Sequence, residues 1–529
     1  MFNKKLLKTI GSVLFLFTIC FGIISCAYAA ETGNDTKTTN QTNLKTNITI
    51  DPKTIGGLKE AINSVKINGT IYLKNGVYTG TNNTGIIIKK NINIEGLGSN
   101  VTINAQGKNR IFSIENCKVS IKNMKFVNGN ANGSGGAINS VNSSLSVKNC
   151  IFSNNQANQS GDGGAINCYN MINATINKCA FINNQAFDGG AIYGAKTINN
   201  CIFENNKATW GGGGAIYDAE TINNCIFRNN KADKFGGAID NSLKIYNCTF
   251  KNNQAGWYGG AISSQYTSIN KCTFINNQAD YGGAIRDVEY SAIKNCIFEN
   301  NKAKHGGAIG AYNTAVNNCI FNSNQAKEYG GAIISSFSTI RKCTFKNNQA
   351  KYGGAISDFS HSPINNCTFI NNKANLDGGA IYENFSSVFN EDVPVTSIFK
   401  VTNCIFTNNQ AKRDGGAIFE NDKEIIEKDN HKFKNSFILT NCIFTKNQAK
   451  NGGAIYSKVK STVKKSTFTN NQGKLKGGAI YNLAKSLKIT NSKFKNNIAA
   501  KKYNAIFSKS KVSKVNVKIT PKEGTKVKK

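Results

Sequence analysis

Residues 221–239 read TINNCIFRNNKADKFGGAI, and this stretch is one copy of a pattern that recurs along most of the chain. Each copy contains two elements, an Ile-x-x-Cys-x-Phe-x-x-Asn-x-Ala segment and, after a short link, Gly-Gly-Ala-Ile. Fourteen copies of Gly-Gly-Ala-Ile occur, mostly 23 to 26 residues apart, and a degenerate copy follows at residues 504–507. A tandem repeat of this length predicts a solenoid rather than a set of compact domains.

The spacing of apolar residues within one repeat indicates strands. Cys225 and Phe227 lie two residues apart, which places both side chains on one face of a strand, and neither element shows an apolar period of 3.6. One repeat of two or three short strands cannot bury a core alone, but stacked repeats bury a continuous one. We therefore predict an all-β fold, a right-handed parallel β-helix. At a strand spacing of about 4.8 Å, some 18 to 20 rungs would make a rod about 90 Å long.

The repeated phenylalanines, from Phe152 to Phe494, are predicted to stack inside the coil as an aromatic column. The asparagine three residues after each phenylalanine is predicted to form a ladder, because its amide can hydrogen-bond the identical amide one rung above and below. We also expect this asparagine to adopt the left-handed turn conformation, which Asn tolerates. The predicted ladder residues are Asn155, Asn184, Asn206, Asn230, Asn253, Asn277, Asn301, Asn324, Asn348, Asn372, Asn409 and Asn447.

Twelve of the 16 cysteines occupy one position of the repeat. They predict a column of buried thiols, namely Cys150, Cys179, Cys201, Cys225, Cys248, Cys272, Cys296, Cys319, Cys343, Cys367, Cys404 and Cys442. Stacked neighbours would lie within disulfide distance, but side chains on in-register strands point in parallel and fit the disulfide dihedral poorly. Met124, Ser466 and Ser492 fill the same position in other repeats, which favours free thiols and leaves disulfides as the alternative. No Cys/His spacing typical of a metal site accompanies these cysteines.

The N-terminus has the layout of a secretory signal. Lysines precede an apolar run from Ile10 to Ile24, and the small-residue motif Ala27-Tyr28-Ala29 follows. We predict that residues 1–29 are a signal peptide and that residues 30–47 form a disordered leader. A lipoprotein signal through Cys26 is the alternative. The apolar run is short for a bilayer, so we expect no transmembrane segment in the mature chain.

The remaining chain divides by its pattern. Residues 48–130 are predicted to contain a helical cap at residues 54–65 and the opening rungs, which keep strand alternation without the strict repeat. Residues 131–507 are the repeat β-helix. Residues 508–529 form a basic tail, predicted to be exposed either as a last edge strand or as a tether.

Two repeats are longer than the others, with extra segments at residues 384–399 and 420–437. Because both occupy the same repeat position, we expect them to emerge side by side on one lateral face. They are either binding loops on a rigid scaffold or tolerated insertions. We interpret the acidic stretch at residues 420–429 as a solvated loop rather than a cation site.

The formal net charge of +35 predicts anionic partners. Secretion favours anionic glycans, cell-wall polymers or the surfaces of other cells over nucleic acid. The lysines are scattered along the repeats, so solubility and protection of sheet edges explain them equally well. We expect a monomeric rod.

Two families carry the same motifs. Gly-Gly-Ala-Ile paired with Phe-x-x-Asn resembles the repeat pair of the chlamydial polymorphic outer membrane proteins. The whole layout, including Ile71-Tyr-Leu-Lys-Asn-Gly-Val-Tyr78, is similar to the adhesin-like, Asn/Thr-rich surface proteins of methanogenic archaea. The likeness covers about residues 48–507, and it implies a secreted, cell-surface adhesin.

An enzyme is the main rival, because pectin-lyase-like β-helices are often carbohydrate-active. Hydrolases on this scaffold resemble one another in clustering three aspartates on adjacent rungs, whereas lyases place an arginine beside calcium-binding carboxylates. Four aspartates precede Gly-Gly here and are expected to lie rungs apart, namely Asp162, Asp188, Asp377 and Asp414. His305-Gly306 occurs without partners. We predict no catalytic, cofactor-binding or metal-ligating residue and therefore an adhesin, with a polysaccharide lyase or hydrolase, or a purely structural wall protein, as the alternatives.

Overall fold

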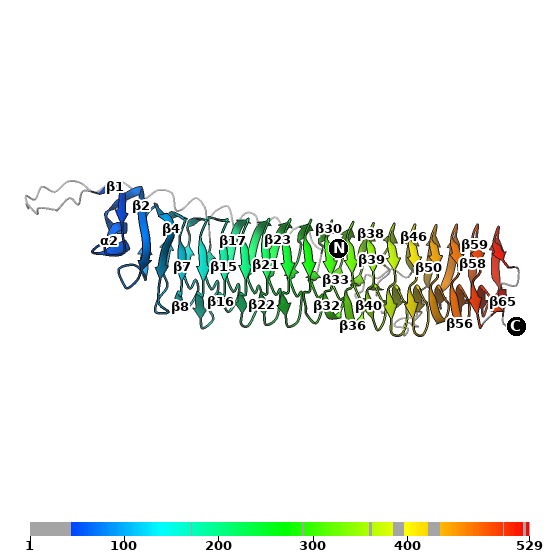
Figure 1. Ribbon diagram of the computed structural model, residues 1–529. Coiled ribbons are helices and arrows are strands. Elements are labelled where there is room, and N and C mark those ends of the chain that lie inside the picture. The colour runs from blue at the N-terminus through cyan, green and yellow to red at the C-terminus, as the bar shows by residue number, and fades with distance from the viewer. Residues whose placement is uncertain are drawn as a thin grey trace, which may run out of the picture. The chain divides into compact units, whose positions relative to one another are not determined.

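The computed structural model describes residues 44–170, 172–287, 290–358, 362–384, 396–421, 434–500, 502–521 and 525–527. The chain from Leu44 onward forms one right-handed parallel β-solenoid of about 18 turns, which confirms the predicted fold class. Figure 1 shows the turns stacked in chain order, from α2 (Gly57–Ser64) and β2 (Val65–Tyr78) to β65 (Thr525–Val527). The predicted signal peptide and residues 30–43 of the predicted leader lie outside the described residues, whereas residues 45–47 of that leader belong to the strand β1 (Lys45–Ile50), which pairs with β2.

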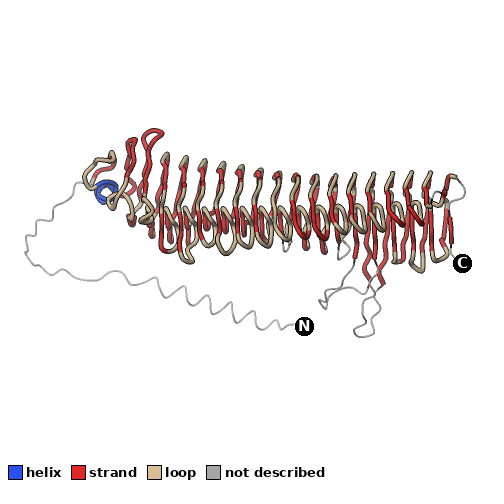
Figure 2. Tube along the Cα trace, turned by 60° about the horizontal axis from the view of Figure 1, so that its bottom comes forward, coloured by secondary structure: helices blue, strands red, loops and turns tan. Residues whose placement is uncertain are grey.

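Each rung of the repeat has three straight sides, the first of which is a single strand in some rungs and two strands in others. In a typical rung these are β20 (Ile216–Asn223), β21 (Ile226–Arg228) and β22 (Lys231–Ala232). A link ending in Gly-Gly then leads to β23 (Ile239–Tyr246), the first strand of the next rung. Neighbouring rungs pair in parallel register, so that Ile216 lies beside Ile239 and Phe227 beside Phe250. Like residues therefore stack on like residues, and Figure 2 shows the repeated strands and turns this produces.

The residues at the corners between strands have left-handed backbone conformations, with positive φ. Asn224, just before Cys225, has a φ of 53°, and Asn229, just before the ladder residue Asn230, has a φ of 56°. The prediction that the ladder asparagine itself is left-handed is therefore wrong. The bend precedes the ladder residue, whose side chain points into the core and whose backbone N–H bonds to the next rung.

The interior holds the predicted aromatic column. The Phe203 and Phe227 ring centroids lie 4.8 Å apart with an interplanar angle of 5°, and the Phe227 and Phe250 rings repeat this spacing. These side chains are fully buried and belong to one continuous hydrophobic core. The column contributes large apolar burial and ring contacts along the solenoid.

The twelve ladder asparagines are all buried. Asn206 shows their pattern: its backbone N–H and its Nδ2 both donate 3.0 Å hydrogen bonds to Oδ1 of Asn230, one rung on. Its Nδ2 also donates to the Phe181 carbonyl oxygen at 2.9 Å. These bonds satisfy polar groups that would otherwise be buried without partners.

The twelve predicted column cysteines, together with Cys117 and Cys168, are buried free thiols. Within the column, the backbone N–H of Cys201 donates to Sγ of Cys225 at 3.4 Å. Ser466 Oγ accepts the Cys442 N–H in the same way, at 3.2 Å. The repeat position thus needs a small side chain that can accept a hydrogen bond. Burial raises the pKa of the Cys225 thiol well above its ordinary value, which keeps it protonated.

The helix α2 packs against the N-terminal end of the core. Leu58, Ala61 and Ile62 of α2 are buried in the same core cluster as Val65, and the Leu58 N–H donates to Asn83 Oδ1 at 3.0 Å. At the other end, the basic tail continues the coil. There β63 (Val512–Val515) pairs with β58 (Leu487–Thr490), and β64 (Lys518–Thr520) pairs with β59 (Lys493–Lys495).

The two long repeats keep their register. Before the extra segments, β45 (Ile381–Asn384) pairs with β49 (Ile418–Asn421), and after them β46 (Thr396–Thr402) pairs with β50 (Lys434–Thr440). The strands that begin and end both segments therefore lie side by side. The segments themselves, with the acidic stretch beyond Asn421, lie outside the described residues.

Candidate functional site

The residues on either side of each ladder asparagine face outward. The one before it turns the corner, and the one after it is the outward residue of the short third strand. Because rungs are in register, these residues form two parallel rows of amides and lysines, which we term the amide–lysine face. Its members are Asn154, Gln156, Asn183, Gln185, Asn205, Lys207, Asn229, Lys231, Asn252, Gln254, Asn276, Gln278, Asn300, Lys302, Ser323, Gln325, Asn347, Gln349, Asn371, Lys373, Asn408, Gln410, Lys446, Gln448, Asn470 and Gln472.

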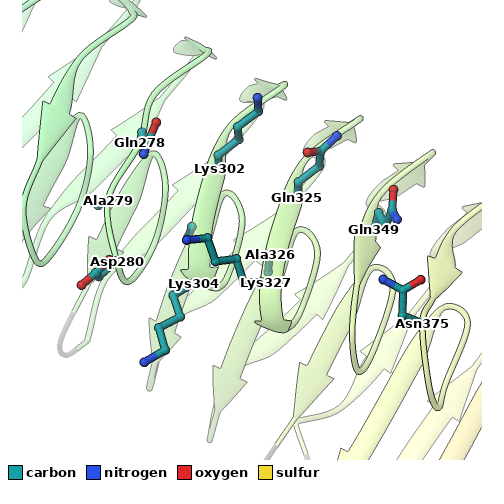
Figure 3. Close-up of a pocket in the computed structure, with 11 residues that line it drawn as sticks. Gln278, Ala279, Asp280, Lys302, Lys304, Gln325, Ala326, Lys327, Gln349 and Asn375 are labelled. Atoms are coloured by element: carbon teal, nitrogen blue, oxygen red, sulfur yellow. The ribbon is translucent and has the colours of Figure 1, made fainter.

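Shallow depressions lie on this face. One of about 360 Å³ crosses the rungs of β32 (Lys302–His305), β36 (Gln325–Tyr329) and β40 (Gln349–Ala350). Figure 3 shows Gln278, Lys302, Gln325 and Gln349 in one row, with Lys304 and Lys327 nearer to the links. A second depression, of about 500 Å³, continues along the same rows and is lined by asparagine, glutamine and lysine alone. Such groups donate and accept hydrogen bonds at a repeat fixed by the rung spacing of about 4.8 Å.

A second outward feature is a column of rings in the links. The residue before Gly-Gly is aromatic in six successive repeats, with neighbouring ring centroids 4.6 to 5.6 Å apart. We term this column the aromatic ribbon: Phe235, Tyr258, Tyr281, His305, Tyr329 and Tyr352. The His305 ring lies between those of Tyr281 and Tyr329, and burial lowers its pKa. His305 is thus a member of a ring stack.

The four aspartates that precede Gly-Gly form two pairs on adjacent rungs. The Gly163 N–H, next to Asp162, donates to the Asp188 carbonyl at 3.0 Å, and the Gly378 N–H, next to Asp377, donates to the Asp414 carbonyl at 2.9 Å. The prediction that these aspartates lie rungs apart is therefore wrong within each pair. The members of each pair precede two consecutive copies of Gly-Gly-Ala-Ile, and consecutive copies stack as neighbouring rungs. Asp377 is held by Arg413, whose Nε donates to it at 2.8 Å.

The first pair belongs to a larger group of carboxyls. Asp188 Oδ1 accepts the Gly212 N–H at 2.7 Å, and Asp240 approaches the same glycine from the following rung. Burial raises the pKa of Asp162 to about 6, with the Asp188 charge adding to the rise. Burial also raises the pKa of Asp188, and that of Asp240 to about 7. Carboxyls with such pKa values exchange protons near neutral pH.

Two further observations bear on the site. Within the described ranges, no three His, Cys, Asp or Glu side chains gather as they would around a metal ion. In the same part of the chain, no helix has the length and apolar character needed to span a bilayer.

Sequence analysis did not identify the amide–lysine face or the aromatic ribbon. Both could have been found by reading the residues that flank the repeated Asn and Gly-Gly, since their types recur in successive copies.

Two protein families have models that match parts of the chain. The right handed beta helix region matches residues 196–350 and 239–409. The Chlamydia polymorphic membrane protein repeat matches residues 149–169, 403–419, 441–458 and 465–483, which supports the predicted likeness of the repeat and suggests a protein of the outer surface. The likeness to archaeal adhesins stays a prediction. No curated protein matches the chain.

Solved structures give only distant likenesses. A PL6 alginate lyase in complex with trisaccharide is 12% identical, with 75% of this chain and 86% of that chain covered and a TM-score of 0.32. The catalytic domain of a GH87 alpha-1,3-glucanase in complex with nigerose is 11% identical, with 92% and 70% covered and a TM-score of 0.24. Tailspike protein 3 of bacteriophage CBA120 is 10% identical, with 89% and 59% covered and a TM-score of 0.20.

Proposed function

We propose that the protein is a secreted, adhesin-like rod of the cell surface that binds glycans or cell-wall polymers without altering them. The observation that carries this proposal is the amide–lysine face, which repeats hydrogen-bonding groups from Asn154 to Gln472. A polymer of similar repeating units can lie along such a face and make the same contact many times. Many weak contacts then add up to firm attachment.

Charge supports an anionic polymer as the main partner. The net charge is +35, and Lys302, Lys304 and Lys327 surround the depression of Figure 3. Exposed lysines attract carboxylates and phosphates over roughly a Debye length, about 8 Å at physiological salt. Glutamine and asparagine amides between them would hydrogen-bond sugar hydroxyls.

The test is a binding screen of the purified chain against arrayed glycans and wall polymers at low and high salt. The variant Lys302→Gln/Lys304→Gln/Lys327→Gln removes three charges from one depression. The matched control, Lys148→Gln/Lys244→Gln/Lys294→Gln, removes three exposed charges from other strands. The proposal predicts saturable binding to a defined polymer, weakened several-fold more by the first variant than by the control. Equal losses in both variants, or binding to every polyanion that vanishes with salt, would leave only a cationic structural rod.

A polysaccharide-active enzyme is the second candidate, favoured by one observation. Asp162 and Asp188 lie on adjacent rungs with raised pKa values, and Asp240 is close by. A pair of carboxyls that share protons near neutral pH is the arrangement that glycoside hydrolysis uses. Shortening of any polymer in the screen, abolished by Asp188→Asn, would establish this alternative.

A further inference from the structure

The two tryptophans of the sequence are both exposed and lie on the same edge of the solenoid. Trp210 is 57% exposed and Trp257 is 51% exposed. Each follows the short third strand of its rung, β19 (Lys207–Ala208) and β25 (Gln254–Ala255), in the link that leads to Gly-Gly. Tryptophan is on average among the more buried residues, and exposed tryptophans are enriched where proteins bind partners. Two on one edge therefore point to a binding site.

Lys234 lies between the two indoles, in the link of the intervening rung. Its Nζ is 3.2 Å from the Trp210 ring centroid and 5.5 Å from that of Trp257. Phe187 stacks on Trp210 at 5.1 Å, and Phe235 meets Trp257 edge-on at 5.8 Å. The two Lys234 Nζ distances place the indole centroids less than about 9 Å apart. We term Trp210, Lys234 and Trp257 the tryptophan patch.

A separation of this size would accommodate one flat ring in the position that the Lys234 side chain now takes. Contacts of about 4 Å on each side fill most of the separation, so a sugar ring fits if the Lys234 side chain moves aside. That side chain is flexible, and the ammonium lies close enough to Asp188 to influence its pKa. Lys234 can therefore exchange its contact with Trp210 for one with Asp188 or with a bound hydroxyl.

Carboxyl groups lie beside the patch. They can approach the Trp210 rung closely because the two residues after Trp210 are glycines, which have no side chains. A Cβ on Gly211 would lie 1.8 Å from Asp188 Oδ1, and one on Gly212 would lie 1.9 Å from Asp240 Oδ2. The two carboxyls thus occupy the notch that these glycines leave. Indole rings beside carboxyl and ammonium groups match a sugar, which has apolar C–H faces and polar hydroxyl edges. Apolar side chains of a peptide would offer the carboxyls no further hydrogen-bond donor.

Local charge distinguishes the patch from the rest of the rod. Four carboxyls lie in the rungs around the patch, namely Asp162, Asp188, Asp218 and Asp240. The cation that contacts the indoles is Lys234. A carboxylated sugar would meet like charges here, so the patch favours an uncharged one. We propose that Trp210 and Trp257 bind a neutral hexose unit of a glycan between them, displacing Lys234 toward Asp188. This inference deepens the proposed function and rests on it, by adding a neutral-sugar site to the polymer-binding face.

Tryptophan fluorescence reports on the patch alone, since the sequence has no other tryptophan. The full chain is titrated with a panel of neutral hexose oligosaccharides, glucans, mannans and galactans of several linkages, and with polyuronate oligosaccharides of equal length. The titrations are made in about 1 M NaCl, where the Debye length is about 3 Å. A saturable emission change is expected with at least one neutral oligosaccharide and with no polyuronate. Calorimetry on Trp210→Ala and on Trp257→Ala should show at least ten-fold weaker binding of that oligosaccharide.

The matched control is Tyr266→Ala/Tyr290→Ala, which removes an exposed ring pair with centroids 5.8 Å apart and should leave affinity unchanged. An equal loss in this control would overturn the assignment, as would a fluorescence response to polyuronates or to an apolar peptide. The Lys302→Gln/Lys304→Gln/Lys327→Gln variant separates the two proposals. If wall polymers bind that face while no neutral oligosaccharide changes the emission, the tryptophan patch is wrong and the proposed function stands. If no polymer or glycan binds anywhere, the proposed function fails as well.

Discussion

The side-chain amide of Asn277 donates a 3.1 Å hydrogen bond to Oδ1 of Asn301 on the next rung, and the same oxygen accepts the Asn277 backbone N–H at 2.9 Å. Asn301 in turn donates to the Phe274 carbonyl at 3.0 Å. Asn301→Ala removes the acceptor of the Asn277 N–H and of one Asn277 amide hydrogen, and it removes the donor to the Phe274 carbonyl; each buried group left unsatisfied costs about 1–3 kcal/mol. We expect a loss of at least about 3 kcal/mol in urea unfolding, with faster hydrogen exchange of the Asn277 N–H. The exposed Lys302→Ala serves as the control, and a loss no larger than in that control would contradict a structural ladder.

The ladder shows how far the sequence predicts this fold. A fixed spacing of Cys, Phe and Asn in every copy determines the strand faces, because only an in-register coil stacks each residue on its equivalent. The sequence does not show which of two adjacent asparagines forms the corner and which is buried. Asn229 and Asn230 are chemically identical, and only the backbone of the folded chain separates the left-handed corner from the buried amide.

The positions of surface residues relative to one another were harder to predict, because the links between strands differ in length. Trp210 stands three residues before its Gly-Gly pair and Trp257 two residues before its own, so alignment on the repeat does not bring them together. Their proximity depends on links of unequal length that follow strands in register. The pairing of Asp377 with Asp414 was missed similarly, since an extra segment of one long repeat separates them in sequence.

The thiol column predicts a sharp difference between native and unfolded protein. The fourteen described cysteines are buried and free, and burial raises the pKa of the Cys168 thiol to about 12. A thiol-alkylating reagent should therefore label none of them in the native protein, because the buried sulfur atoms are not accessible to it. Denaturation without reductant should make all fourteen reactive by mass analysis. Recovery of fewer than half as free thiols would support disulfides instead.

The raised pKa of Asp240 predicts that the stability of the folded protein depends on pH. The folded protein holds a proton on Asp240 up to about pH 7, whereas the unfolded chain releases it near pH 4. The folded state therefore binds more protons between these values, and its stability falls as pH rises from about 4 to about 7. Asp240→Asn should reduce this decline and be more stable than the parent by about 1–3 kcal/mol at pH 7.5. Urea unfolding at pH 5 and pH 7.5 checks the slope, and exposed Asp233→Asn is the control. Parallel pH profiles for Asp240→Asn and the parent would contradict the raised pKa.

Binding without turnover is tested most directly by following one polymer in a single sample. The wall polymer that binds best in the screen is incubated with the full chain, and its affinity and chain-length distribution are measured together over several days. The proposed adhesin predicts saturable binding with the polymer length and its chain ends unchanged, and in Asp188→Asn the polymer length and chain ends should also stay unchanged. Shorter chains or new reducing or unsaturated ends, lost in Asp188→Asn, would show that the rod is an enzyme.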